Sequence, residues 1–159
     1  MTAARVSPRL LAVLLTLAAS SWSAAILLAP LARASLPVAA TIVDLTASFV
    51  CHQRDERSFH LQGGRLAVCG RCTGLYLAGT LGALAAWFGR ARLPASTRRL
   101  ILLAAVPTAA TFAVEWIGFA NPGNTVRAAA ALPLGGAAGW LFVRMLRVEE
   151  QPGTCAIIT

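Results

Sequence analysis

Charge is what this sequence has least of. Only 13% of its 159 residues are charged and none is lysine, whereas about a quarter of a typical soluble domain is charged. Hydrophobic residues account for 57% of the chain, and the mean hydropathy is +0.68. So little polar surface excludes an intrinsically disordered chain and argues against an ordinary soluble enzyme. The composition instead predicts an all-α polytopic membrane protein in contact with a lipid bilayer.

Common sequence signatures of catalysis are also absent. The chain has no phosphate-binding loop, no dinucleotide-binding glycine pattern, no zinc-protease helix motif and no nucleophile-elbow motif. Its six acidic residues form no cluster of the kind that binds calcium or magnesium. Fourteen arginines give a formal net charge of +8. We interpret this charge as a signal of membrane orientation and expect no nucleic-acid partner.

Four apolar segments are candidates for membrane-spanning helices: residues 10–32, 73–89, 100–120 and 125–146. A hydrocarbon core of about 30 Å requires about 20 helical residues, which these lengths approach or exceed. Residues 35–50 are apolar but shorter, and they include Asp44. We therefore expect a short interfacial or re-entrant helix there, with a fifth span as the alternative.

The first apolar segment has a second interpretation. It ends at Ala32-Arg33-Ala34, which matches the small-residue pattern of a signal-peptide cleavage site. The apolar run is longer than a signal peptide needs, which favours an uncleaved anchor. Because the other connections are short, we expect residues 1–159 to form one integral membrane domain.

Arginine positions predict the orientation of the helices, because positive charges concentrate on the cytoplasmic side. With four spans and an inner N-terminus, a compact arginine cluster lies inside: Arg90, Arg92, Arg98 and Arg99. Trp87 and Trp140 then lie near the inner surface. Residues 51–72 are placed on the outer face of the plasma membrane.

Residues 51–72 form a polar segment that holds three of the four cysteines and both histidines. The spacing Cys69-x-x-Cys72 lets two sulfurs bind one metal ion or each other. A tetrahedral zinc site needs four ligands, and the expected set is Cys51, His52, Cys69 and Cys72. Thiolate and imidazole together favour zinc. We expect His60 to be a surface histidine.

The same cysteines admit other functions. Cys72 directly precedes an apolar helix, whose N-terminal dipole, together with Arg71, would lower a thiol pKa. This arrangement is typical of a membrane thiol–disulfide oxidoreductase. Alternatively, the cysteines form a structural disulfide or are inert, or the segment docks a membrane protein partner in a non-catalytic accessory subunit.

Glu115 is an acidic residue inside an apolar segment, which is costly and marks a candidate functional site. Arg127 follows the Asn121–Asn124 turn. Glu115 and Arg127 lie at different expected depths in the membrane, but a long arginine side chain can span the difference, so the two residues can pair. On the four-span topology both lie at the same face as Tyr76 and the cysteines. These three residues are our candidate catalytic residues, although a structural ion pair explains Glu115 and Arg127 equally well.

Two further patterns concern the arginines of the polar segment and helix packing. The polar segment contains four arginines: Arg54, Arg57, Arg65 and Arg71. They form either a solvated surface or a cluster that binds an anion. Small residues four apart predict closely packed helix faces at Ala78 and Gly82 and at Gly135 and Gly139.

Taken together, the motifs resemble the signature of an uncharacterised prokaryotic membrane-protein family, domain of unknown function 2085 (DUF2085). The resemblance is carried by Cys51-His52-Gln53-Arg54-x-x-Arg57-Ser58-Phe59 and by Val68-Cys69-x-Arg71-Cys72-Thr73-Gly74-x-Tyr76. Asn124-x-x-Arg127 also matches, whereas Glu115 replaces the family's usual Asp. The resemblance covers roughly residues 45–143 and implies a membrane location and a shared site, without a known activity.

Overall fold

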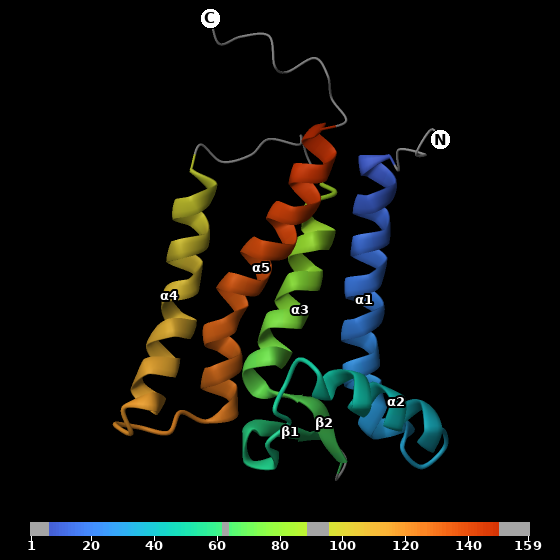
Figure 1. Ribbon diagram of the computed structural model, residues 1–159, viewed down its shortest axis with the longest axis vertical. Coiled ribbons are helices and arrows are strands. Elements are labelled where there is room, and N and C mark those ends of the chain that lie inside the picture. The colour runs from blue at the N-terminus through green and yellow to red at the C-terminus, as the bar shows by residue number, and fades with distance from the viewer. Residues whose placement is uncertain (1–6, 62–63, 89–95, 150–159) are drawn as a thin grey trace, which may run out of the picture.

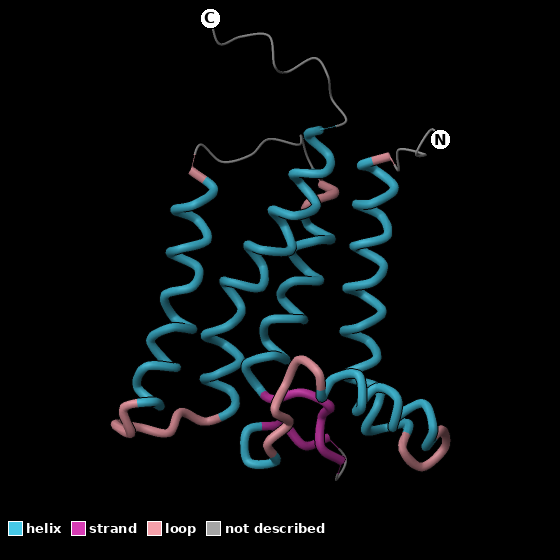
Figure 2. Tube along the Cα trace, viewed as in Figure 1, coloured by secondary structure: helices cyan, strands magenta, loops and turns pink. Residues whose placement is uncertain are grey.

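The computed structural model describes residues 7–61, 64–88 and 96–149. The described residues form five α-helices and one short hairpin, which lies at one end of the helices (Figures 1 and 2). In chain order the elements are α1 (Pro8–Ala32), α2 (Pro37–Ser48), a 3-10 turn (Asp55–Arg57), β1 (Ser58–Leu61), β2 (Gly64–Cys69), α3 (Gly70–Ala85), α4 (Thr97–Trp116) and α5 (Asn124–Glu149).

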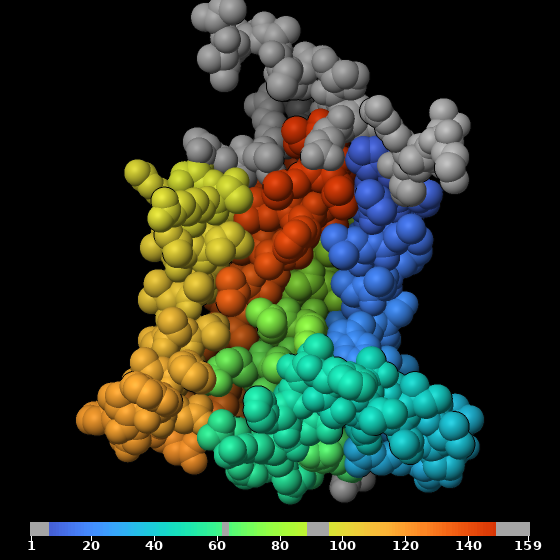
Figure 3. Space-filling model, in the orientation of Figure 1, coloured from blue at the N-terminus to red at the C-terminus, as the bar shows by residue number. Residues whose placement is uncertain are grey.

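Four of the helices run side by side. In Figure 1, α3 lies between α1 and α5, and α4 packs on the outer side of α5. The start of α1 and the end of α5 lie at one end of the bundle, and α2 and the β1–β2 hairpin lie at the other. The space-filling view shows α2 and the hairpin as a broad base beneath the helices (Figure 3). We call this the hairpin end of the bundle.

Three helices, α1, α4 and α5, are long and apolar enough to cross a membrane. Their outward faces carry large apolar side chains, such as Leu17 and Leu103, which are 58% and 71% exposed. Helix α3 has 16 residues and rises about 24 Å at 1.5 Å per residue. The structure is thus mostly helical with three candidate spans, and α3 packs among them.

The predicted small-residue faces meet in the contact between α3 and α5. A Cβ atom on Gly82 would overlap the carbonyl of Gly136, and one on Gly139 would overlap the carbonyl of Gly79. The helices therefore approach backbone to backbone, as small-xxx-small patterns allow. The prediction for Gly82 and for the Gly135 and Gly139 pair is confirmed.

Hydroxyl groups join α1 to α3 inside the bundle. Ser23 Oγ lies 2.8 Å from Thr80 Oγ1, which also donates to the carbonyl of Ala19 at 2.9 Å. Trp87 Nε1 donates to Thr16 Oγ1 at 2.9 Å. Polar groups in an apolar bundle need such partners, and these bonds set the register of the two helices.

The polar segment differs from the all-α expectation, because it folds into an antiparallel hairpin. Ser58 pairs with Cys69 and Leu61 with Gly64, with an irregularity between Ser58 and His60. The strands form because Leu66, Ala67 and Val68 are buried against α1 and α2, where their backbone groups need sheet partners. The sequence pattern missed them because only ten residues are involved.

Several helix ends also differ from the expected ones. Helix α3 begins at Gly70, so Cys72 lies in its first turn and not before it. Helix α4 ends at Trp116, where Gly118 adopts φ +72° and the chain turns. Helix α2 is short, as expected, and crosses the hairpin end (Figure 1). Residues 89–95, which include the expected end of the second span and Arg90 and Arg92, lie outside the described residues.

Candidate metal centre and arginine pocket

Three cysteines from three elements meet at the hairpin end. Cys51 follows α2, Cys69 ends β2, and Cys72 lies in the first turn of α3. Their sulfur atoms all lie within 4.8 Å of one another, and all three are free thiols. The hairpin makes this possible because it returns the chain from Ser58 to its strand partner Cys69.

The loop that carries Cys51 is held by side chains on both sides. Gln53, at φ 49°, donates from Nε2 to the carbonyls of Asp44 at 2.6 Å and Ala67 at 2.8 Å. The Cys69 N–H donates to Cys51 Sγ at 3.2 Å. Asp44 in turn pairs with Arg33 at 3.0 Å, which joins α2 to the end of α1. The position of Cys51 therefore depends on contacts to both α2 and β2.

The environment favours a thiolate at one of the three cysteines, Cys69. Cys51 is buried, and Cys69 and Cys72 are half-buried. A hydrogen bond from the Cys72 side chain lowers the pKa of the Cys69 thiol to about 5, although burial acts in the opposite direction. A thiolate is the form of cysteine that binds metal ions and attacks disulfides.

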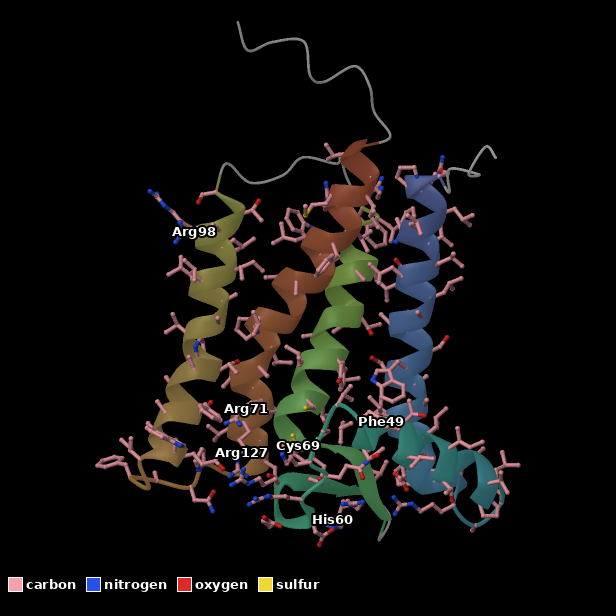
Figure 4. The ribbon with its side chains drawn as sticks, in the orientation of Figure 1. Phe49, His60, Cys69, Arg71, Arg98 and Arg127 are labelled. Atoms are coloured by element: carbon pink, nitrogen blue, oxygen red, sulfur yellow. The ribbon has the colours of Figure 1, made fainter. Side chains whose placement is uncertain are left out.

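The two histidines are placed differently. His52 is exposed and lines the same pocket as the thiols, but it is not part of the close group of three sulfurs. Its role as fourth ligand stays a prediction. His60 lies on the hairpin (Figure 4), where its Nε2 is 3.3 Å from Asp55 Oδ1 and both side chains are largely exposed. This is the arrangement expected of a surface histidine.

Glu115 lies at the centre of an arginine cluster. Its Oε1 is 2.7 Å from Arg57 Nη2 and 3.1 Å from Arg127 Nη2. Its Oε2 is 3.3 Å from Arg71 Nη2. The expected pair with Arg127 is present, but two arginines from the polar segment share the same carboxylate. The catalytic role of these residues stays a prediction.

Arg127 is fixed by the turn that precedes α5. It is 4% exposed and donates from Nη1 to Asn124 Oδ1 at 3.0 Å and from Nη2 to Asn121 Oδ1 at 2.5 Å. Asn124 also donates to the carbonyl of Ser58 at 3.0 Å, so the start of α5 is bonded to the hairpin. The asparagines of the turn thus position Arg127 and link it to the thiol region.

A pocket of about 290 Å³ opens between the thiols and the arginines. Figure 4 shows Arg71, Arg127 and Cys69 near one another at this place. Its lining consists of Val50, Cys51, His52, Gln53, Arg54, Arg57, Cys69, Arg71, Cys72, Phe112 and Arg127. We call it the arginine pocket.

Tyr76 does not line the arginine pocket. Its ring meets Trp22 edge to face, with centroids 6.1 Å apart, and packs against the buried cluster that contains Cys51. Among the three catalytic candidates, Glu115 and Arg127 are therefore in contact, and Tyr76 lies in a neighbouring apolar contact.

A comparison with known proteins agrees with the family resemblance that the motifs carry. A family model described as "Predicted membrane protein (DUF2085)" matches residues 51–141. The chain belongs to this family. The match begins at Cys51 and includes the three clustered cysteines, Glu115 and Arg127.

Two archaeal relatives are similar to this chain. An uncharacterised protein of Methanothermobacter thermautotrophicus is 33% identical over 87 residues, which cover 55% of this chain and 78% of the relative. An uncharacterised protein of Methanocaldococcus jannaschii is 30% identical over 84 residues, which cover 50% of this chain and 53% of that relative. No solved structure matches this chain.

Sequence reasoning missed several residues that build the site. Arg57 and Arg71 were expected as a surface or a separate anion cluster, and their contact with Glu115 depends on the unexpected hairpin. The clamping role of Gln53 was not foreseen. One signal was present, because Gln53, Arg57 and Arg71 all belong to the motif strings that carry the family resemblance.

Proposed function

We propose that this protein is a plasma-membrane protein that binds one zinc ion through Cys51, Cys69 and Cys72. The observation that carries this proposal is the grouping of three sulfurs within 4.8 Å of one another. Zinc–sulfur bonds of about 2.3 Å in a tetrahedron place sulfur atoms about 3.8 Å apart, so a modest contraction of the group suffices. A disulfide would use only two of the three sulfurs.

The surroundings of the sulfurs support a metal site. The N–H of Cys69 donates to Cys51 Sγ, and such bonds stabilise sulfur that carries negative charge. All three cysteines line the arginine pocket, so a fourth ligand can reach the ion from that side. His52 is the proposed protein ligand. A water there would instead leave the ion able to act as a Lewis acid.

We also propose that α3 is a fourth span and that the hairpin end faces outward. Helix α3 packs between helices long enough to cross the membrane, and it runs opposite to α1 (Figure 1). Arg98 lies at the other end of the bundle from Cys69 (Figure 4). The preference of arginine for the cytoplasmic side supports an orientation with the cysteines on the outer face.

A second candidate function is thiol–disulfide exchange. The observation that favours it is the lowered pKa of the Cys69 thiol, about 5, in a Cys-x-x-Cys pair at the start of a helix. In this reaction the Cys69 thiolate attacks a partner disulfide and Cys72 resolves the mixed disulfide. The partner is reduced and the Cys69–Cys72 pair is oxidised.

The test measures zinc by elemental mass spectrometry and counts thiols in the detergent-purified full chain. We expect about one zinc per chain, as a closed or water-completed tetrahedral site holds a single ion. The double variant Cys69→Ser, Cys72→Ser should lose it, and Cys155→Ser, which changes the cysteine far along the sequence from the cluster, should keep it. Protein without metal whose two thiols convert reversibly to a disulfide would overturn the zinc proposal in favour of exchange.

A further inference from the structure

The zinc proposal leaves the positive charge of the arginine pocket unexplained. Four arginines line the pocket, and the carboxylate of Glu115 contacts three of them: Arg57, Arg71 and Arg127. Three thiolates around a divalent ion carry a net charge of −1, the same as one thiolate without metal. In either state the pocket therefore keeps a surplus of two positive charges.

We propose that the arginine pocket binds a phosphate group, on a small phosphate ester or on a lipid headgroup. A phosphate monoester carries a charge of about −1.5 to −2 at neutral pH, which matches the surplus. Guanidinium groups bind phosphate oxygens through paired, charge-assisted hydrogen bonds. This inference goes beyond the metal site and does not depend on it.

Two helix N-termini converge on the same place. Helix α3 begins at Gly70 and α5 at Asn124, and a Cβ atom on Gly70 would lie only 2.8 Å from the Asn124 carbonyl oxygen. Neither helix has an acidic residue in its first turn. Helix N-termini carry partial positive charge and bind anions, so both helices add to the potential of the arginines.

Two of the arginines retain unused donors. Arg127 is 4% exposed, and its Nε has no hydrogen-bond partner among the described residues. The Nε of Arg71 is likewise buried without a partner in the described part of the chain. Both side chains line the pocket. Because buried donors are normally bonded, these two guanidinium groups retain capacity for a further acceptor beside them.

Glu115 occupies an electrostatically unfavourable position in its own helix. It lies in the last turn of α4, where the helix dipole repels a carboxylate. Its position is therefore explained by the arginines that surround it and not by its own helix. We infer that Glu115 keeps the guanidinium groups in position. It competes with the incoming anion for their hydrogen bonds.

The size and walls of the pocket suit a phosphate ester. Its volume of about 290 Å³ has room for several waters and so for a phosphate group. Val50 and Phe112 line it beside the charged groups, and Phe112 lies under Arg71 at 5.7 Å. The apolar walls accept the carbon part of an ester, whether it is a soluble compound or the glycerol of a lipid.

The test titrates inorganic phosphate into the full chain in phosphate-free detergent buffer and follows the melting temperature. Chloride at equal ionic strength is the control for screening. We expect saturable stabilisation by phosphate, weakened tenfold or more in Arg54→Gln through loss of one charged hydrogen bond. Arg98→Gln, which removes the same charge from an exposed site at the other end of α4, should leave phosphate binding unchanged.

Glu115→Gln gives a test of opposite sign. Removing the competing carboxylate should tighten phosphate binding, even though the variant itself is less stable. A merely structural arginine cluster would bind no phosphate in either form. Equal losses in Arg54→Gln and Arg98→Gln would overturn the proposal, and equal effects of phosphate and chloride would rule out a soluble phosphate ester as the ligand.

A second arm separates the two sources of phosphate. The protein is placed in phosphatidylcholine nanodiscs with or without phosphatidic acid, and the melting temperature is measured for wild type and Arg54→Gln. Stabilisation by inorganic phosphate in detergent assigns the site to soluble phosphate esters. Stabilisation by phosphatidic acid alone, lost in Arg54→Gln, assigns it to a lipid headgroup. No response in either arm rejects the phosphate site, whatever the zinc content of the same samples.

Discussion

Arginines lie at both ends of this bundle, but they bond to different groups. At the end where α5 finishes, Arg144 donates to the carbonyl of Phe88 at 2.7 Å and Arg147 donates to that of Ala86. Their guanidinium groups also stack on Trp140 and Trp87, at 5.0 and 5.1 Å from the ring centroids. At the hairpin end, Arg57, Arg71 and Arg127 share one carboxylate beside three thiols and a pocket.

The comparison separates a structural use of arginine from a chemical one. Helix α3 ends at Ala85, and Arg144 and Arg147 donate to carbonyls of the turn that follows it. Their charges face backbone and aromatic rings. The arginines of the hairpin end instead line a pocket and carry more positive charge than the single carboxylate of Glu115 can balance. Among the residues that the structure describes, those of the hairpin end therefore have the features of a binding site.

Loss of the shared carboxylate should have the largest effect on stability. Glu115→Gln leaves the buried Arg127 without its ionic partner, and breaking a buried ion pair costs about 3 kcal/mol or more. We expect a large fall in melting temperature in detergent. Asp44→Asn is the matched control at the same end, because the Arg33–Asp44 pair is partly exposed and should cost less than about 1 kcal/mol. Equal losses in the two variants would contradict the central position of Glu115.

A change in the contact between α3 and α5 should disturb both ends together. Gly139→Ala places a methyl group on the carbonyl of Gly79, and overpacking of this kind costs about 1–3 kcal/mol. Gly136→Ala is the control, because its Cβ would lie 3.8 Å from the nearest atom, an ordinary contact. We expect Gly139→Ala alone to lower the melting temperature and to reduce zinc content. A stable Gly139→Ala protein would mean that the two helices pack less closely than described.

A substitution at the end of the bundle where α5 finishes should lower stability without changing the binding site at the hairpin end. Arg144→Gln removes a buried charged hydrogen bond and a stacked guanidinium, a loss of about 1–2 kcal/mol. Thermal unfolding should show this loss, and zinc and phosphate binding should stay at wild-type values. Reduced zinc binding in Arg144→Gln would show that the two ends are coupled through α3.

The sequence predicts features that depend on residues close together in the chain better than features that depend on residues far apart in the chain. Apolar runs placed the long helices to within a few residues, because a span leaves a local compositional signal. The Glu115–Arg127 pair was predicted because one turn joins the two helices and the difference in depth between the residues is short enough for an arginine side chain. The contacts of Arg57 and Arg71 did not follow, because they require the hairpin to bring Ser58 to Cys69. A two-stranded sheet of ten residues, with alternation over only one short strand, is too weak a signal to read in advance.

The smallest expected effect concerns His60, the exposed histidine of the hairpin end. His60 pairs with Asp55 across an exposed surface, and such pairs contribute little to stability. His60→Gln should therefore change neither the melting temperature nor zinc affinity, measured by competition with a chromogenic chelator. His52→Gln removes an imidazole that lines the pocket beside the thiols, so it should weaken zinc binding by tenfold or more if it is the fourth ligand. Unchanged zinc affinity in both variants would leave a three-thiolate site completed from the pocket, which places the metal and the proposed phosphate group within reach of each other.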